Sequence, residues 1–136
     1  MYKLLNEAYV EITNIVESGR IGIPQICVLS VNDHDCQQNS TKRMETELAL
    51  LSRLIGNSTL KNEERLFNPQ PYIHGFVARE YENGAIIRYA YTAAPSKNIT
   101  SLNVYGTNGE IRFDTETGEI LVFKQIPDHQ GEPLLY

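Results

Sequence analysis

The sequence predicts an α+β protein in which two main helices pack on one face of a mostly antiparallel, open sheet of about six strands. Two segments before Asn57 carry apolar side chains at the three- and four-residue spacing of amphipathic helices. From Tyr72 onward, short apolar runs alternate with turns that contain glycine and asparagine, which is typical of strands joined as hairpins. The length of 136 residues suits one core, so we expect residues 1–136 to form a single domain.

The first helix is indicated by one apolar stripe near the N-terminus. Its members share one face: Leu5, Ala8, Tyr9, Ile12, Ile15 and Val16. Gly19 follows the stripe and suits the left-handed conformation that ends many helices. Pro24 cannot continue a helix, and the β-rich segment 25–31 after it predicts a strand.

A polar, turn-prone loop over 32–41 precedes the second helix, which we expect over 43–55. The apolar stripe of this helix consists of Met44, Leu48, Leu51 and Ile55. Thr41 suits the start of the helix and Gly56 its end. Residues 57–71 show little periodicity and predict an irregular connection.

The remaining chain predicts five strands. We expect them over 73–81, 85–92, 101–105, 110–114 and 119–124. Asn83-Gly84, between the first two, is the strongest short hairpin signal in the sequence. The tail over 126–136 contains two prolines and a glycine and predicts an extended or loosely held end.

Composition excludes several classes of protein. The net charge is −5, from 12 basic and 17 acidic residues, and the basic residues are scattered, so no nucleic-acid partner is expected. No apolar run approaches the ~18 residues of a membrane span, and the N-terminus lacks the apolar stretch of a signal peptide. Two cysteines are too few for a disulfide framework. We therefore expect a cytoplasmic protein with no membrane partner.

Metal-ligand residue types occur together at Asp33-His34-Asp35-Cys36. Adjacent residues of an extended segment point in opposite directions, so one ion cannot easily take all four, and a solvated polar loop is the better interpretation. His74 and His129 have no carboxylate, serine or cysteine partner at a recognisable spacing. The sequence thus predicts no metal site and no catalytic residue.

Three stretches together resemble the C-terminal domain of the Gfo/Idh/MocA oxidoreductases. They are Glu17-Ser18-Gly19-Arg20-Ile21-Gly22, Tyr81-Glu82-Asn83-Gly84-Ala85 and Val104-Tyr105-Gly106-Thr107-Asn108-Gly109-Glu110, with Leu50 to Gly56 ending a helix between them. In that family a nicotinamide-binding Rossmann domain precedes this one. Here the match begins a few residues after Met1, so we expect no room for that domain.

The resemblance also implies where a substrate would lie. The family carries an Asp and a His four residues apart before the middle helix, and alignment on Leu50 to Gly56 places them near Lys42 and Thr46. It places the loop with Asp33 and His34 on the same side. The family's Glu-Lys-Pro motif and a G-x-G-x-x-G turn are both missing. We expect no dehydrogenase activity from the chain alone, and NAD(P) only with a separate Rossmann-domain partner.

The uncovered face of the sheet is the expected contact surface. Along 85–92 one face presents Ala85, Ile87, Tyr89 and Tyr91, and the other presents Ile86, Arg88, Ala90 and Thr92. Eight tyrosines suit either half-buried sheet positions or a protein interface. Domains of the resembled family commonly oligomerise through this face. The candidates for a homo-oligomer contact are Arg88, Tyr89, Tyr91, Tyr105 and Phe113.

Three functions remain open from the sequence. The favoured one is a stand-alone, non-catalytic domain that oligomerises or binds a ligand or partner. The alternative is the substrate-domain half, or a fragment, of an NAD(P)-dependent sugar or polyol oxidoreductase completed by a separate Rossmann domain. A decayed remnant is the third, although the intact cap and stripe of the first helix argue against gross decay.

Overall fold

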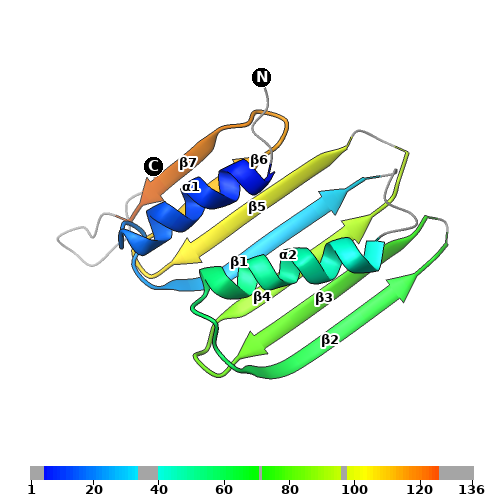
Figure 1. The fold of residues 1–136 in the computed structure, drawn as a ribbon, viewed down its shortest axis with the longest axis horizontal. Helices are drawn as coiled ribbons and strands as arrows, with labels where there is room; N and C mark the ends of the chain where they lie inside the picture. The colour runs from blue at the N-terminus through cyan, green and yellow to red at the C-terminus, as the bar shows by residue number, and fades with distance from the viewer. Residues whose placement is uncertain (1–4, 34–39, 71, 96–97, 126–136) are drawn as a thin grey trace.

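The computed structural model describes residues 5–33, 40–70, 72–95 and 98–125. Its elements, in chain order, are α1 (Leu5–Glu17), β1 (Pro24–Asn32), α2 (Ser40–Leu54), β2 (Leu60–Asn68), β3 (His74–Tyr81), β4 (Ile86–Thr92), β5 (Ile99–Gly106), β6 (Gly109–Asp114) and β7 (Ile120–Lys124). Figure 1 shows two layers, with both helices on the same face of one sheet. The predicted tail over 126–136 lies outside the described residues.

The sheet has seven strands in the order β2-β3-β4-β1-β5-β6-β7. β1 and β4 run parallel, whereas the other five neighbouring pairs are antiparallel. The predicted class, a mostly antiparallel sheet of about six strands, is therefore wrong in its strand count and in missing that the sheet is mixed. The parallel pair forms because the chain between β1 and β4 crosses over the sheet as α2 and returns through the β2–β3 hairpin.

The strand that the sequence analysis missed is β2, within the segment expected to be irregular. All nine of its residues are exposed. Apolar and polar residues do not alternate along its sequence as they do in a half-buried strand. It forms the edge of the sheet and is held by its backbone pairing with β3, from Leu60 opposite Tyr81 to Asn68 opposite His74.

The structure confirms the predicted hairpin turn at Asn83-Gly84 and the predicted helix end at Gly19. Asn83-Gly84 joins β3 to β4, and the Tyr81 N–H donates to the Ala85 carbonyl oxygen at 2.9 Å. Gly84 adopts φ 86°, which a residue with a Cβ disfavours. Gly19, after α1, has φ 80°, as expected for a helix end.

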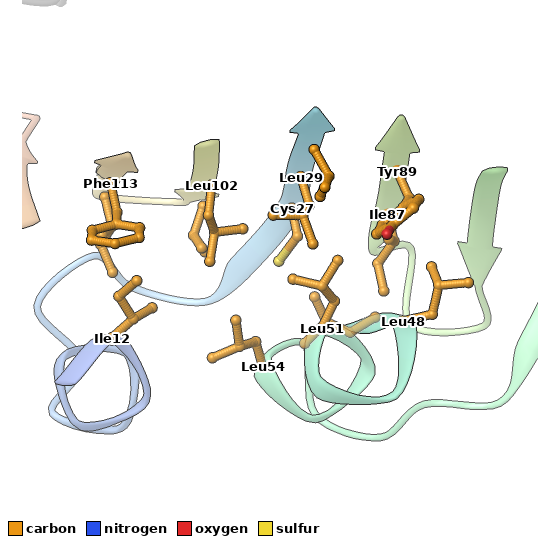
Figure 2. Close-up of a cluster of buried hydrophobic side chains, with 14 of the residues drawn as sticks. Ile12, Cys27, Leu29, Leu48, Leu51, Leu54, Ile87, Tyr89, Leu102 and Phe113 are labelled. Atoms are coloured by element: carbon orange, nitrogen blue, oxygen red, sulfur yellow. The ribbon is translucent and has the colours of Figure 1, made fainter. Parts of the chain in front are cut away.

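The core lies between the helices and the sheet. Figure 2 shows Ile12 of α1 pointing toward Phe113 of β6, and Leu48 and Leu51 of α2 pointing toward β4 and β1. All four side chains are at most 2% exposed. Burial of each contributes roughly 1.5–3 kcal/mol to folding, so the amphipathic stripes read from the sequence are what hold the layers together.

The opposite face of the sheet has no described helix over it (Figure 1). Paired residues in neighbouring strands project on the same side, so the strand register assigns this open face. One row across it reads Phe76, Ala90, Ser30 and Ser101, and the next reads Ala78, Arg88, Val28 and Asn103. None of the described helices is long and apolar enough to cross a membrane.

Candidate functional site

The residues that the family resemblance would place on a substrate side lie where β1 ends and α2 begins. Asp33 follows β1, and its N–H donates to the Thr92 carbonyl oxygen at 2.9 Å. Its carboxylate accepts a hydrogen bond of 2.6 Å from Nη1 of Arg43, in the first turn of α2. This ion pair fixes the end of the strand against the start of the helix.

Arg43 also belongs to a polar network on the inner side of α2. Its Nε donates to Oε1 of Glu47 at 2.9 Å, and its Nη2 donates to Oγ1 of Thr100 at 3.3 Å. The Tyr89 hydroxyl donates to the same Glu47 oxygen at 2.7 Å. Glu47 is only 6% exposed, so these protein donors replace the water that its carboxylate would otherwise bind.

Tyr89 is held in its neutral form. Burial raises the pKa of its hydroxyl well above the ordinary value, and the charge of the adjacent Glu47 adds to this effect. The hydroxyl therefore remains a hydrogen-bond donor at physiological pH. Its bond to Glu47 joins β4 to α2 inside the protein.

Lys42 and Thr46, the positions aligned with the family's Asp and His, are exposed on α2. The Thr46 hydroxyl donates to the Lys42 carbonyl oxygen of its own helix at 2.9 Å. One position further along, Arg43 and Glu47 carry the buried polar chemistry instead. The structure does not bring Lys42 or Thr46 into that network.

Sequence analysis assigned no role to Glu47, although the structure buries its side chain. The sequence did contain a signal for the burial of Glu47. Glu47 lies three residues after Met44 and four before Leu51, so it falls on the apolar stripe of α2. Its partner Arg43 precedes it by four residues, which is the spacing of a helical ion pair.

Residues 34–39 of the predicted polar loop lie beyond the described part of the chain, including His34, Asp35 and Cys36, and the last two loop positions are the first residues of α2. Within the ranges that the structure does describe, no group of three or more His, Cys, Asp or Glu side chains is arranged to hold a metal ion. Asp33 is thus placed as the partner of Arg43, and His34 stays a prediction.

A mostly apolar cavity of about 190 Å³ lies between α2 and the β2–β3 edge of the sheet. It is lined by Met44, Arg65, Leu66, Phe67, Gly75, Val77 and Tyr91. Gly75 faces the helices beside Tyr91 and adds no side chain there, which leaves part of this space. A lining with so few polar groups suits a small apolar group better than a sugar or polyol, whose hydroxyls need partners.

Arg65, at the rim of the cavity, is engaged in a charge cluster. Its Nη1 donates to Oε1 of Glu45 at 2.7 Å, and both Arg65 and Arg79 donate to Glu63. The hydrogen bond from Arg65 is the main reason why the pKa of Glu63 lies below its ordinary value, and Arg79 adds to it. The cluster ties α2 to the edge of the sheet, so Arg65 is not free to bind an anion in the cavity.

The predicted oligomer residues divide between the two faces of the sheet. Arg88 and Tyr105 lie on the open face, as the pairing of Arg88 with Val28 and of Tyr105 with Ile26 shows. Tyr89, Tyr91 and Phe113 lie on the helix-covered face and are at most 3% exposed. These three are core residues, because odd positions of β4 and β6 point toward the helices.

No family model matches the sequence, and no curated protein matches it. Solved structures share the fold. The chain is similar to the WlbA dehydrogenase of Bordetella pertussis, solved with NADH and UDP-GlcNAcA, with a TM-score of 0.68 and 16% identity over 90% of this chain and 44% of that one. An oxidoreductase from Pseudomonas syringae gives a TM-score of 0.65 and 13% identity over 93% of this chain and 41% of that one.

An inositol dehydrogenase homologue from Azotobacter vinelandii, solved with NADH and myo-inositol, gives a TM-score of 0.60 and 14% identity over 87% of this chain and 39% of that one. These neighbours are oxidoreductases of the Gfo/Idh/MocA type, in agreement with the resemblance seen in the sequence. At such identities the likeness shows the fold. The chain spans less than half the length of each of these enzymes.

Proposed function

We propose that this chain is a non-catalytic module that assembles with a second copy of itself through the open face of its sheet. The observation that carries the proposal is the apolar centre of that face. Across β3, β4 and β1 it consists of Phe76, Ala78, Ile86, Ala90, Ile26 and Val28. Arg88 and Ser30 lie among these residues, so the centre is a mixed surface with an apolar majority. No described helix covers it, and protein contacts commonly combine apolar and polar residues in this way.

The size of the open face suits an interface between two copies. Seven strands at a spacing of ~4.8 Å, with about six paired residues of ~3.3 Å along each strand, span roughly 30 Å by 20 Å. That gives about 600 Å² per copy, approaching the ~800 Å² per partner of a standard interface. If the two copies are related by a twofold axis that lies in the plane of the contact, each copy covers the apolar centre of the other.

The charges of the open face support a self-complementary contact. Two copies of a protein with net charge −5 repel each other at long range. The open face, however, carries Arg88 and Arg112 as well as Glu80 and Glu110. A twofold arrangement can set the basic side chains of one copy against the acidic ones of the other.

Catalysis by this chain alone is disfavoured by its chemistry. Hydride transfer needs a held nicotinamide and a group that takes the hydroxyl proton. Lys42 and Thr46 stand at the positions of the family's Asp and His, and both are exposed. The glycine turn from Gly19 to Gly22 follows a helix and leads into β1, so it is not the strand-to-helix turn that cradles a pyrophosphate. We therefore propose that the chain binds no NAD(P) by itself.

The oligomeric state in solution tests the proposal. Light scattering coupled to size exclusion should give at least twice the monomer mass of 15.4 kDa. Arg88→Glu, on the open face, should lower that mass, whereas Arg53→Glu, an exposed charge reversal on α2, should leave it unchanged. A wild-type monomer at all concentrations, or equal masses for the two variants and the wild type, would overturn the proposal.

A second candidate function is the substrate-domain half of a split oxidoreductase. The likeness to solved enzymes over less than half of their length favours it. A pull-down from the native cell, followed by mass spectrometry, separates the two candidates. Recovery of a Rossmann-domain protein in equal amount would favour the split enzyme, and assays with NAD(P) and polyols or sugars would follow. Recovery of this chain alone would favour the self-assembling module.

A further inference from the structure

The free edge of β2 concentrates exposed apolar side chains. Leu66 is 71% exposed, Phe67 66% and Leu60 43%, and Tyr72 just beyond the strand is 44% exposed. β2 pairs with β3 along one side, and the sheet order leaves its other side as the end of the described sheet. Long exposed edges with large apolar residues present backbone donors and acceptors to another strand.

These side chains lie on both faces of the sheet edge. Leu66 pairs with Phe76 and belongs to the open face, whereas Phe67 pairs with Gly75, beside the buried Tyr91, and belongs to the helix-covered face. A partner that docks on the open face can cover Leu66 but cannot reach Phe67. A strand added to the edge covers both, because its successive side chains alternate between the two faces.

The charges of β2 favour a second copy of the same strand. The charges of Lys61, Glu63, Glu64 and Arg65 sum to zero within a chain of net charge −5, so the edge itself adds no net repulsion between two copies. In an antiparallel pair centred on Glu64, Glu63 of each copy lies opposite Arg65 of the other, on the helix-covered face. Both residues already belong to the charge cluster of their own chain, so these contacts would join the two clusters across the edge. Centring on Glu63 or on Arg65 also places like charges at the axis, and neither register forms these two Glu63–Arg65 pairs.

We infer that the β2 edges of two copies pair antiparallel around Glu64, so that two seven-stranded sheets become one continuous sheet. This interface is separate from the open-face contact of the proposed function. The edge axis is perpendicular to the plane of the sheet, whereas the open-face axis lies parallel to that plane. Where the two axes intersect, the two contacts close into a tetramer with two kinds of twofold contact.

One feature of this register opposes the pairing. Glu64 of one copy faces Glu64 of the other on the open face, and directly opposed like charges are unfavourable. Glu64→Gln should therefore tighten the edge contact about two- to fivefold in Kd. Glu82→Gln, at an exposed position in the β3–β4 turn, is the matched control and should leave Kd unchanged.

Mass measurements with one variant for each interface test the inference. Phe67→Lys places a charge at the edge without touching the open face. Ile23→Lys is its control, at an apolar position that is 71% exposed against 66% for Phe67. A wild-type tetramer that becomes a dimer with Phe67→Lys, but not with Ile23→Lys, supports the edge contact. A dimer lost with Arg88→Glu but unaffected by Phe67→Lys overturns the edge contact and leaves the proposed function standing. A mass that responds to Phe67→Lys alone supports the edge and contradicts the open face.

Hydrogen exchange on the wild-type protein gives a second test that needs no variant. Strand addition protects the β2 amides that point away from β3, and this protection should rise with protein concentration. Exchange of these amides that is equally fast at all concentrations would overturn the inference, even if Phe67→Lys failed to fold.

Discussion

The hydroxyl of Tyr89 and a carboxylate oxygen of Glu47 meet at 2.7 Å inside the protein, 42 positions apart in the chain. The same oxygen accepts Nε of Arg43 at 2.9 Å. One buried acceptor therefore connects β4 and the start of α2, and through Arg43 it also reaches Asp33 at the end of β1.

Removing the acceptor should be more harmful than removing one donor. Glu47→Ala leaves the Tyr89 hydroxyl and Arg43 Nε without this partner, while Arg43 keeps Asp33, so we expect a loss of about 2–4 kcal/mol in the free energy of unfolding. Tyr89→Phe removes one donor and leaves Arg43 on the carboxylate, so a loss of about 1–3 kcal/mol is expected. Urea denaturation followed by circular dichroism measures both.

Glu47→Gln is the control variant for Glu47→Ala. It keeps an oxygen acceptor of the same shape and removes the charge, so it should fall between the wild type and Glu47→Ala. Equal stability of Glu47→Ala and the wild type would show that the network contributes nothing to folding.

The thiol of Cys27 should be inert in the folded protein. Burial raises its pKa from 9.0 to about 12, and the thiolate is the reactive form. In a Cys36→Ser background Cys27 is the sole thiol. Iodoacetamide at pH 8 should then modify the native protein far more slowly than the same protein in urea, as followed by mass spectrometry.

The raised pKa of Cys27 should also affect the stability of the protein at alkaline pH. Above pH 9 the unfolded chain releases the Cys27 proton while the folded chain retains it until about pH 12. The free energy of unfolding should therefore fall as the pH rises through this range. Rapid native labelling at pH 8 would contradict both expectations.

Glu63 should make the protein sensitive to acid. Its pKa is lowered chiefly by the hydrogen bond from Arg65, so its contribution to stability is present above its ordinary value of 4.5 and is lost as the pH falls through the lowered value. Because the Glu63 side chain is 24% exposed, Glu63→Gln should reduce stability at pH 7 by about 1 kcal/mol or less.

Denaturation at pH 7 and pH 3 measures this effect. The difference in stability between Glu63→Gln and the wild type should shrink at the lower pH. Glu119→Gln, an exposed position next to β7, serves as the control and should show no such change. A constant difference at both pH values would exclude Glu63 as a source of the acid sensitivity.

Two glycines should respond differently to alanine. A Cβ at Gly106 would lie 2.2 Å from the backbone oxygen of Ile21, so Gly106→Ala must displace the chain before β1 and should cost roughly 1–3 kcal/mol. A Cβ at Gly84 meets nothing within 4 Å, and only its positive φ opposes the change, so about 1 kcal/mol is expected. Thermal unfolding of the two variants compares their losses of stability. A larger loss for Gly84→Ala than for Gly106→Ala would contradict this prediction.

Much of the helix-covered layer followed from the sequence. The stripe of α1, the Asn83-Gly84 hairpin and the separation of Ile87, Tyr89 and Tyr91 from Arg88 all depend on spacing within a few residues. Such spacing is a local property of the chain, because side chains repeat every two residues in a strand and every three or four in a helix. The candidate site was predicted only in its position, next to Asp33 and the start of α2.

The tertiary structure decided what depends on neighbours distant in the chain. β2 is a strand because the β3 backbone pairs with it. Its own charged sequence has no alternation of apolar and polar residues that would predict a strand. β1 and β4 are parallel because of the crossover between them. Glu47 is buried because Tyr89 and Arg43 supply its hydrogen bonds, and Tyr89, Tyr91 and Phe113 are core residues because both helices pack on their side of the sheet. In each case at least part of the deciding energy comes from a partner that lies far away in the chain, such as Tyr89 for Glu47.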